Sequence, residues 1–232
     1  MVNFVKSQPP PASLAIEKQK PSGRYNLEDV LIKLREDFFN KCYLCEEKFI
    51  TSINVEHFIP HLGRNLDLKF DWNNLFWACS HCNLTKNTYD QEMLNCTNPE
   101  HDVLYWISYR LGAFPKEELM LEIEFESDEE TDFDISIVEN TVELLKRCYN
   151  GTTLHKKMEA SNLRQKVLLE IQAFEEKLID YLFGGYDEEE EKEYLKRKIK
   201  EHLSVKSSFT AFKKWIVLDN ALHKETFKSL FD

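Results

Sequence analysis

Two cysteine pairs with the spacing C-x2-C are the residues of this chain whose chemistry is clearest. They are Cys42 with Cys45 and Cys79 with Cys82. Four thiolates in two such pairs form the closed tetrahedral ligand set of structural zinc, which leaves no coordination position open for catalysis. The spacing therefore predicts one structural Zn²⁺ per chain. The other two cysteines, Cys96 and Cys148, have no such spacing, and we expect them to be plain thiols.

Polar side chains that suit phosphodiester hydrolysis lie between and beside these pairs. They are, in chain order, Glu56, His57, Asn74 and Asn83. An imidazole can take a proton from water near neutral pH, and carboxylate and amide oxygens suit a hard cation such as Mg²⁺. Adjacent strand residues point to opposite faces, so Glu56 and His57 can face one site only if their strand ends or bulges there. Pro60 favours such an end.

Short elements are expected to position these side chains. A helix over 27–40, with Asn26 as its N-cap and apolar residues along one face, leads into the first cysteine pair. Alternating residues predict a strand over 52–58, a return strand over 76–78, and a short helix over 80–89. A unit of this size cannot bury a core alone, so we expect zinc binding to be coupled to its folding.

Two segments resemble the halves of the HNH endonuclease motif. They are VEHFIPH at 55–61 and NNLFWACSHCNLTK at 73–86, in the family's order and enclosed by both cysteine pairs. The resemblance covers about residues 42–88. It implies an α+β fold with a small zinc-stapled ββα-metal core, an N-terminal helix and a mostly helical C-terminal half. It also implies metal-dependent cleavage of DNA that leaves 5′-phosphate and 3′-hydroxyl ends.

The resemblance further implies a role for each site residue. His57 matches the general base, and Asn74 matches the residue that holds the base and the metal loop in place. Glu56 and Asn83 match the ligands of one Mg²⁺ or Mn²⁺. Lys86 matches a helix lysine close to the phosphate.

Two further histidines and several plainer interpretations stay open. His61 in the loop and His81 inside the second cysteine pair are weak candidates for phosphate contacts. Alternatively, His57 is a core histidine, Asn74 caps a turn, and Lys86 is a solvated helix residue. The chain would then be a non-catalytic zinc module that binds a partner or nucleic acid.

The net charge of −11 lies in the second part of the chain. Residues 1–90 hold 11 Lys and Arg and 11 Asp and Glu, whereas residues 91–232 hold 19 and 30. Because neutralisation of phosphates drives non-specific DNA binding, an acidic surface is a poor DNA clamp. Residues 91–232 would suit a partner that supplies basic surface, although charge runs are usually just solvated.

The pattern predicts three parts. They are an extended segment over 1–25, a nuclease domain over 26–98 and an acidic, mainly helical, partner-binding region over 99–232. In the last part we expect helices over 102–111, 139–149, 152–183, 187–203 and 207–230, and a strand over 119–125 paired with one over 133–137. The chain shows no long apolar run and no signal-peptide pattern, which favours a cytoplasmic protein without a membrane span.

The nuclease part is also similar to one branch of the HNH family. Residues 39–46, 56–61 and 70–83 resemble the PtuB nucleases of Septu-type anti-phage systems, which also occur in retron-linked operons. This resemblance implies a bacterial protein that acts on DNA together with a PtuA-like ATPase bearing an ABC/SMC-type head, docked on residues 99–232. A solo HNH nuclease of restriction type is the alternative.

Overall fold

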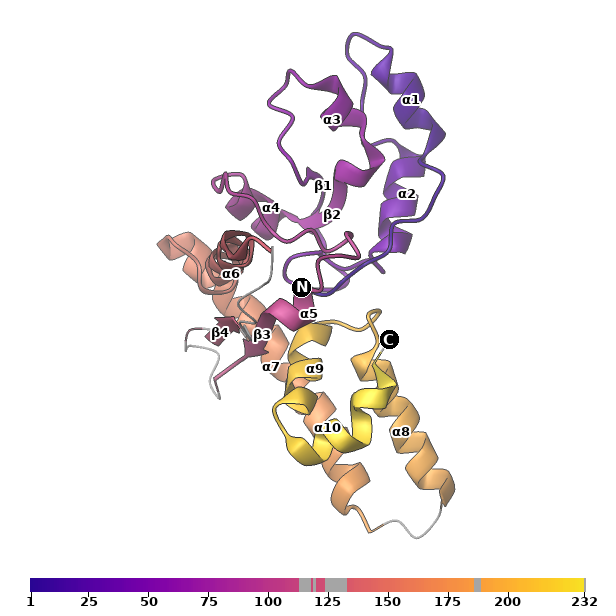
Figure 1. Ribbon diagram of the computed structural model, residues 1–232, viewed down its shortest axis with the longest axis vertical. Helices are drawn as coiled ribbons and strands as arrows, with labels where there is room; N and C mark the ends of the chain where they lie inside the picture. Colours follow the sequence, from indigo (N-terminus) through magenta and orange to yellow (C-terminus); the bar gives the residue numbers. More distant parts are fainter. Residues whose placement is uncertain (113–117, 119, 124–132, 186–188, 232) are drawn as a thin grey trace.

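A computed structural model describes residues 1–112, 118, 120–123, 133–185 and 189–231 of the chain. In Figure 1 the elements of the first 90 residues lie at one end, and α8, α9 and α10 lie at the other. The elements before residue 90 are α1 (Ala12–Lys18), α2 (Glu28–Asp37), β1 (Ile53–His57), α3 (Leu66–Phe70), η1 (Trp72–Asn74), β2 (Leu75–Cys79) and α4 (Ser80–Lys86). The later ones are α5 (Val103–Trp106), β3 (Ile107–Arg110), β4 (Met120–Ile123), α6 (Ile135–Asn150), α7 (Leu154–Phe183), α8 (Glu189–Leu203), α9 (Thr210–Leu218), α10 (Ala221–Phe227) and η2 (Lys228–Leu230).

The strand–strand–helix unit forms as the sequence predicts, and the mixed α+β class is confirmed. β1 pairs antiparallel with β2, so that Ile53 lies opposite Cys79 and His57 lies opposite Leu75. All five residues of β2 are buried. α4 starts directly after β2 because the Cys79 side chain accepts the backbone N–H of Cys82. The second cysteine pair therefore spans the junction of strand and helix.

The expectations for the first 70 residues need three corrections. The extended interpretation of 1–25 is wrong over residues 12–18, which form α1 after Pro11, a residue compatible with a helix start. α2 begins after Leu27 without a side-chain cap, so Asn26 is not its N-cap. The loop that follows β1 contains α3, whose first turn is capped by the side chain of Asn65.

The C-terminal half also differs from expectation in its strands. The helix predicted over 102–111 ends at Trp106, and Ile107–Arg110 forms β3 instead. Its partner is β4, with Ile107 opposite Ile123. The strand predicted over 133–137 is wrong, because Asp134 caps the start of α6. Residues 124–132, which include the segment between the two predicted strands, lie outside the described residues.

The long helices are close to expectation, with one exception. α6, α7 and α8 lie within a few residues of the predicted ranges. The helix predicted over 207–230 is divided, because Asn220 accepts the backbone N–H of His223 and starts α10. None of the described helices is long and apolar enough to cross a membrane.

Two hydrophobic clusters hold the described residues together. The larger one contains Met1, the four cysteines of the two C-x2-C pairs, the buried faces of α2 and α6, and Trp215 of α9. It therefore crosses the boundary expected near residue 98. The smaller one joins α7, α8, α9 and α10, and its buried members are Phe174, Leu178, Ile199, Leu203, Val217 and Phe227. The unit that carries the two cysteine pairs thus shares a core with the C-terminal half.

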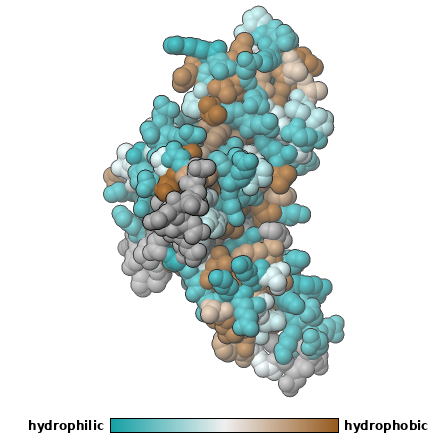
Figure 2. Space-filling model, viewed as in Figure 1, coloured by the Kyte–Doolittle hydropathy of each residue, from teal (hydrophilic) through white to brown (hydrophobic). Residues whose placement is uncertain are grey.

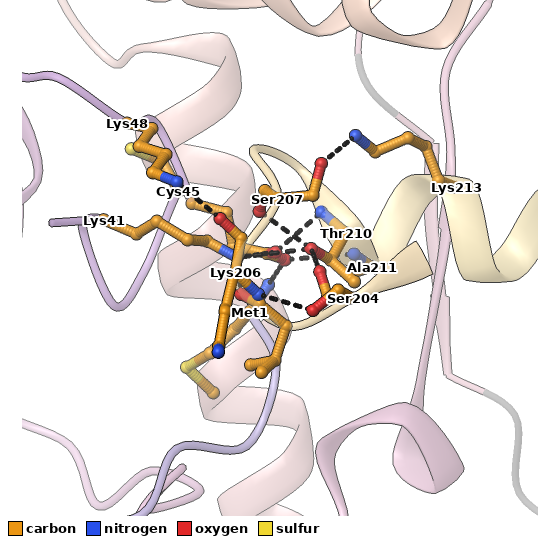
Figure 3. Close-up of polar contacts among 12 residues, drawn as sticks. Met1, Lys41, Cys45, Lys48, Ser204, Lys206, Ser207, Thr210, Ala211 and Lys213 are labelled. Atoms are coloured by element: carbon orange, nitrogen blue, oxygen red, sulfur yellow. Dashed lines mark hydrogen bonds and ion pairs between the residues drawn. The ribbon is translucent and has the colours of Figure 1, made fainter. Parts of the chain in front are cut away.

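A buried carboxylate joins three distant segments beside this core. Glu46 is fully buried; its carboxylate lies 2.9 Å from the Met1 ammonium and 3.1 Å from Lys41 Nζ. It also accepts the backbone N–H groups of Thr210 (2.8 Å) and Ala211 (3.3 Å) at the start of α9. We call these five residues the Glu46 cluster; Figure 3 shows Met1, Lys41, Thr210 and Ala211 converging on one point.

The pKa of Glu46 shows that the cluster is electrostatically satisfied. Burial by itself raises this pKa, but the Met1 ammonium and Lys41 outweigh burial and lower it to about 2. The backbone of Glu46 is left-handed (φ 58°), as is that of Phe209 (φ 49°), a conformation that is unfavourable for residues with a Cβ. The backbone N–H of Phe209 donates to the carbonyl of Glu46 at 3.3 Å, so the two left-handed residues are bonded to each other.

Candidate nuclease site and zinc centre

The four paired cysteines converge on one point. Their sulfur atoms all lie within 4.8 Å of one another, and all four residues are buried. Cys45 Sγ and Cys79 Sγ are 3.9 Å apart, and sulfurs that share a tetrahedral Zn²⁺ at 2.3 Å are separated by about 3.8 Å. The donor set and its geometry fit zinc, as the spacing predicts.

The cysteine loops are fixed by contacts to the C-terminal half. The hydroxyl of Tyr149 donates to the carbonyl of Cys45 at 2.9 Å. His81 lies between α6 and α7, where its Nδ1 is 2.7 Å from a Glu159 carboxylate oxygen and its Nε2 is 2.7 Å from the carbonyl of Cys148. Both ring nitrogens of His81 are therefore engaged away from His57. In this arrangement neither is free for a phosphate.

His57 lies at the end of β1 with a defined tautomer. Its Nε2 is 3.1 Å from the carbonyl oxygen of Lys69. A carbonyl can only accept, so Nε2 carries the proton and Nδ1 carries the lone pair. Burial lowers the pKa of His57 to about 4. The imidazole is thus neutral at physiological pH, as a general base has to be.

Two aromatic rings pack against His57. The ring of Tyr25 meets it edge-on with centroids 4.5 Å apart, and that of His61 does so at 4.4 Å. His61 Nδ1 accepts the backbone N–H of Gly63 at 3.1 Å, which leaves its Nε2 as the donor. Sequence reasoning missed Tyr25, because it lies 32 positions before His57 and no motif spacing includes it.

Asn74 holds the loop that follows His57. Its Oδ1 accepts the N–H of Ile59 at 2.7 Å, and its Nδ2 donates to the carbonyls of Ile59 and Leu68 at 2.9 and 3.0 Å. Its own carbonyl accepts the N–H of Phe58 at 2.9 Å. A buried amide with these bonds fixes the end of β1 relative to α3. This geometry suits a positioning role for Asn74.

Glu56 points into the interior, where it forms an ion pair. One carboxylate oxygen lies 2.7 Å from Lys86 Nζ, and the other accepts the hydroxyl of Tyr43 at 3.0 Å. Burial is the main influence on the carboxyl and raises its pKa, against the opposing effect of Lys86. Lys86 also donates to the carbonyls of His57 (3.1 Å) and Phe58 (2.8 Å). We call this the Glu56–Lys86 pair.

The expected divalent ion can be tested against this arrangement. Asn83 lies on α4, one turn before Lys86, and is half-buried. Both oxygens of Glu56 are engaged by protein donors, and its side chain is 2% exposed. Within the described ranges, the four cysteines are the only group of three or more Cys, His, Asp or Glu close enough to hold a metal. As arranged, Glu56 and Asn83 do not fit Mg²⁺ or Mn²⁺.

Comparison with known proteins supports the nuclease resemblance. Residues 42–88 match the family model of the HNH endonucleases. The match runs from the first zinc-pair cysteine to the residues just after Lys86, so it contains the whole strand–strand–helix unit. No curated protein and no solved structure matches the chain. The chain therefore carries an HNH endonuclease domain with a four-cysteine cluster at residues 42–88.

Proposed function

We propose that the chain is a metal-dependent DNA endonuclease in which His57 is the general base. The observation that carries this proposal is the state of His57 within the HNH segment: it is neutral, with its proton on Nε2 and a lone pair on Nδ1. The proposal assigns one Mg²⁺ or Mn²⁺ to Glu56 and Asn83. In the arrangement described, Glu56 is engaged by Lys86 and is not available to that ion.

The chemistry assigned to His57 is a single proton transfer. Nδ1 takes a proton from a water molecule while the water oxygen attacks phosphorus. The bond from phosphorus to the 3′ oxygen breaks, and that oxygen takes a proton from solvent, which leaves a 5′-phosphate and a 3′-hydroxyl. The Lys69 carbonyl fixes the ring through Nε2, and Tyr25 packs edge-on against it. Asn74 holds the following loop. In this proposal His61, whose Nε2 remains a donor, is the phosphate contact.

His57→Ala tests the assignment. We expect the variant to keep its fold and its zinc and to lose about 10²–10⁴-fold in plasmid cleavage, the usual contribution of a general base. His155→Ala is the matched control, because His155 is exposed on α7 and bonds only weakly to Glu159. Cleavage by His57→Ala at the wild-type rate, with zinc retained, would rule out the proposed base.

We further propose that this nuclease is the effector of a bacterial anti-phage complex and acts in the cytoplasm with a PtuA-like ATPase. Support comes from the resemblance of residues 39–46, 56–61 and 70–83 to the PtuB nucleases and from the charge of residues 91–232, which hold 30 acidic and 19 basic side chains. Figure 2 shows a mainly hydrophilic face, which suits a polar docking surface on residues 99–232. A basic partner would then supply affinity for DNA.

Copurification with the product of the neighbouring gene tests this part. We expect a stable complex that cleaves DNA in Mg²⁺ or Mn²⁺, while the isolated chain cleaves little. Equal cleavage by the isolated chain would instead identify a solo nuclease. If neither preparation cleaves, the chain is a non-catalytic zinc module, a function that the closed Glu56–Lys86 pair would suit.

A further inference from the structure

All three protons of the Lys86 ammonium are used inside the protein. The three acceptors are Glu56 Oε1 at 2.7 Å, the Phe58 carbonyl at 2.8 Å and the His57 carbonyl at 3.1 Å. An ammonium has only three N–H donors. The Lys86 side chain is 5% exposed, so it has neither a free donor nor a solvent-facing position from which to contact a phosphate.

The carboxylate of the pair is closed from the other side as well. Tyr43 donates its hydroxyl to Glu56 Oε2 at 3.0 Å. A Mg²⁺ ligand has to approach the ion to about 2.0–2.1 Å, and the ion keeps several waters when it binds. There is no room for such a hydrated ion at a carboxylate that is 2% exposed. A divalent ion there would also be repelled by the Lys86 charge.

We propose that Lys86 and a divalent cation compete for Glu56, and that the nuclease site is closed to metal until Lys86 leaves the carboxylate. This inference rests on the proposed function for the assignment of Glu56 as a metal ligand. Lys86 thereby regulates the site rather than binding the substrate. Its two bonds to the carbonyls of His57 and Phe58 do not involve Glu56.

The position of Lys86 makes this exchange local. Lys86 is the last residue of the seven-residue helix α4, and the exposed residues Asn87 and Thr88 follow it. Helix ends open at a lower free energy than helix centres. The bonds of Asn74 to Ile59 and Leu68 keep the end of β1, and with it His57, in place when Lys86 moves. The base is therefore held in position in both states.

Binding of Mn²⁺ without DNA tests the competition directly. We would measure free Mn²⁺ by electron paramagnetic resonance with the zinc-loaded wild type, Lys86→Met, the double variant Glu56→Gln with Lys86→Met, and Lys18→Met. We expect Lys86→Met to bind Mn²⁺ at least about 10-fold more tightly than the wild type, in line with the loss of a competing charge. The double variant should lose that gain. Lys18→Met also removes a lysine charge, but one that pairs with Asp67, and should bind like the wild type.

Each outcome decides the inference. Wild-type or weaker Mn²⁺ affinity in folded, zinc-containing Lys86→Met would overturn it. If that variant fails to fold, Lys86→Gln keeps amide donors for the two carbonyls and should show the same gain; loss of zinc from both variants would mean that the pair is structural and would also overturn it. Tighter Mn²⁺ binding without any plasmid cleavage would leave the competition standing and reject the nuclease function. Tight Mn²⁺ binding and cleavage by the wild type would reject the competition and leave the nuclease function standing.

Discussion

Glu46 and Glu56 are both buried carboxylates beside the zinc-binding cysteines, yet their surroundings differ. Glu46 has two cationic partners and two backbone N–H donors, and its pKa is lowered to about 2. Glu56 has one ammonium and one hydroxyl, and its pKa is raised. Burial disfavours the charged form of both groups. The number of donors therefore determines which carboxylate is held permanently ionised and which can change its partner.

The difference matches the places of the two residues in the molecule. The Glu46 cluster joins the chain start, the first cysteine pair and α9 (Figure 3). The Glu56–Lys86 pair joins only β1 to α4, next to His57. A group that fixes distant segments needs a full set of bonds. At the proposed site, fewer bonds leave the Glu56 carboxylate able to change its partner.

The largest expected effect comes from disrupting the four-cysteine cluster, whose geometry fits zinc. Cys45→Ser should unfold residues 42–88, because structural zinc sites contribute about 10–16 kcal/mol of apparent binding energy, as much as a domain's whole stability. Circular dichroism and metal analysis would check this. Cys96→Ser is the control, because Cys96 is buried outside the cluster; it should keep about one zinc per chain. A folded, zinc-free Cys45→Ser protein would show that the metal is dispensable.

The next largest effect separates the two glutamates by stability. Glu46→Ala should lower the free energy of unfolding by about 3–5 kcal/mol, because it leaves the Met1 ammonium and Lys41 buried without a counter-charge. Glu47→Ala is its matched control: Glu47 pairs with Lys166 at the surface, and loss of such a pair changes stability by about 0–1 kcal/mol. Urea unfolding measures both. Equal losses in the two variants would contradict the structural role of the cluster.

Acid titration should distinguish the two carboxyls by sign. The pKa of Glu46 is depressed on folding, so its contribution is present above its ordinary value of 4.5 and is lost as pH falls toward about 2. The pKa of Glu56 is raised, so its ionisation opposes folding as pH rises above 4.5. Glu46→Gln should therefore reduce the loss of stability between pH 5 and about 2. Glu56→Gln should instead reduce any loss of stability as pH rises above 4.5. The same pH dependence in both variants would contradict this difference.

The smallest effect concerns the second partner of Glu56. Tyr43→Phe removes one donor from the carboxylate and should lower stability by about 1–3 kcal/mol, as expected for a buried acceptor that loses a bond. It should also raise the pKa of Glu56 further. Thermal unfolding against pH would measure both changes. Tyr105→Phe, at an exposed residue, is the control and should change neither.

The nuclease unit could be predicted because it depends on local sequence patterns. Contacts between distant segments could not be predicted. β1, β2 and α4 follow from alternation and from the cysteine spacing. Asn74 bonds the loop that follows His57, and its role there stays a prediction. Tyr25, by contrast, contacts His57 from a segment with no motif. The β3–β4 pairing escaped prediction because apolar residues over 102–111 fit a helix as well as a strand.

The Glu46 cluster and the Glu56–Lys86 pair show more clearly that sequence patterns do not reveal contacts between distant residues. In the sequence, Glu46 is an ordinary acidic residue that follows a cysteine. Its donors at Thr210 and Ala211 lie 164 and 165 positions away. Lys86 was predicted to lie close to a phosphate, since sequence alone does not show that the carbonyls of His57 and Phe58 already use its protons. Spacing identifies residue types that can do chemistry, whereas the partners of a charge depend on the folded chain.

The contact between Glu46 and the start of α9 also has a consequence for biosynthesis. The chain emerges from the ribosome N-terminus first, at about 5–20 residues per second, and 165 positions separate Glu46 from Ala211. Roughly 8–33 s therefore pass between the synthesis of the first cysteine pair and the arrival of the donors that complete its surroundings. The HNH segment is synthesised early, but its contacts with α9 form only when synthesis is nearly complete. A prematurely terminated chain would therefore carry the motif residues without the donors at Thr210 and Ala211.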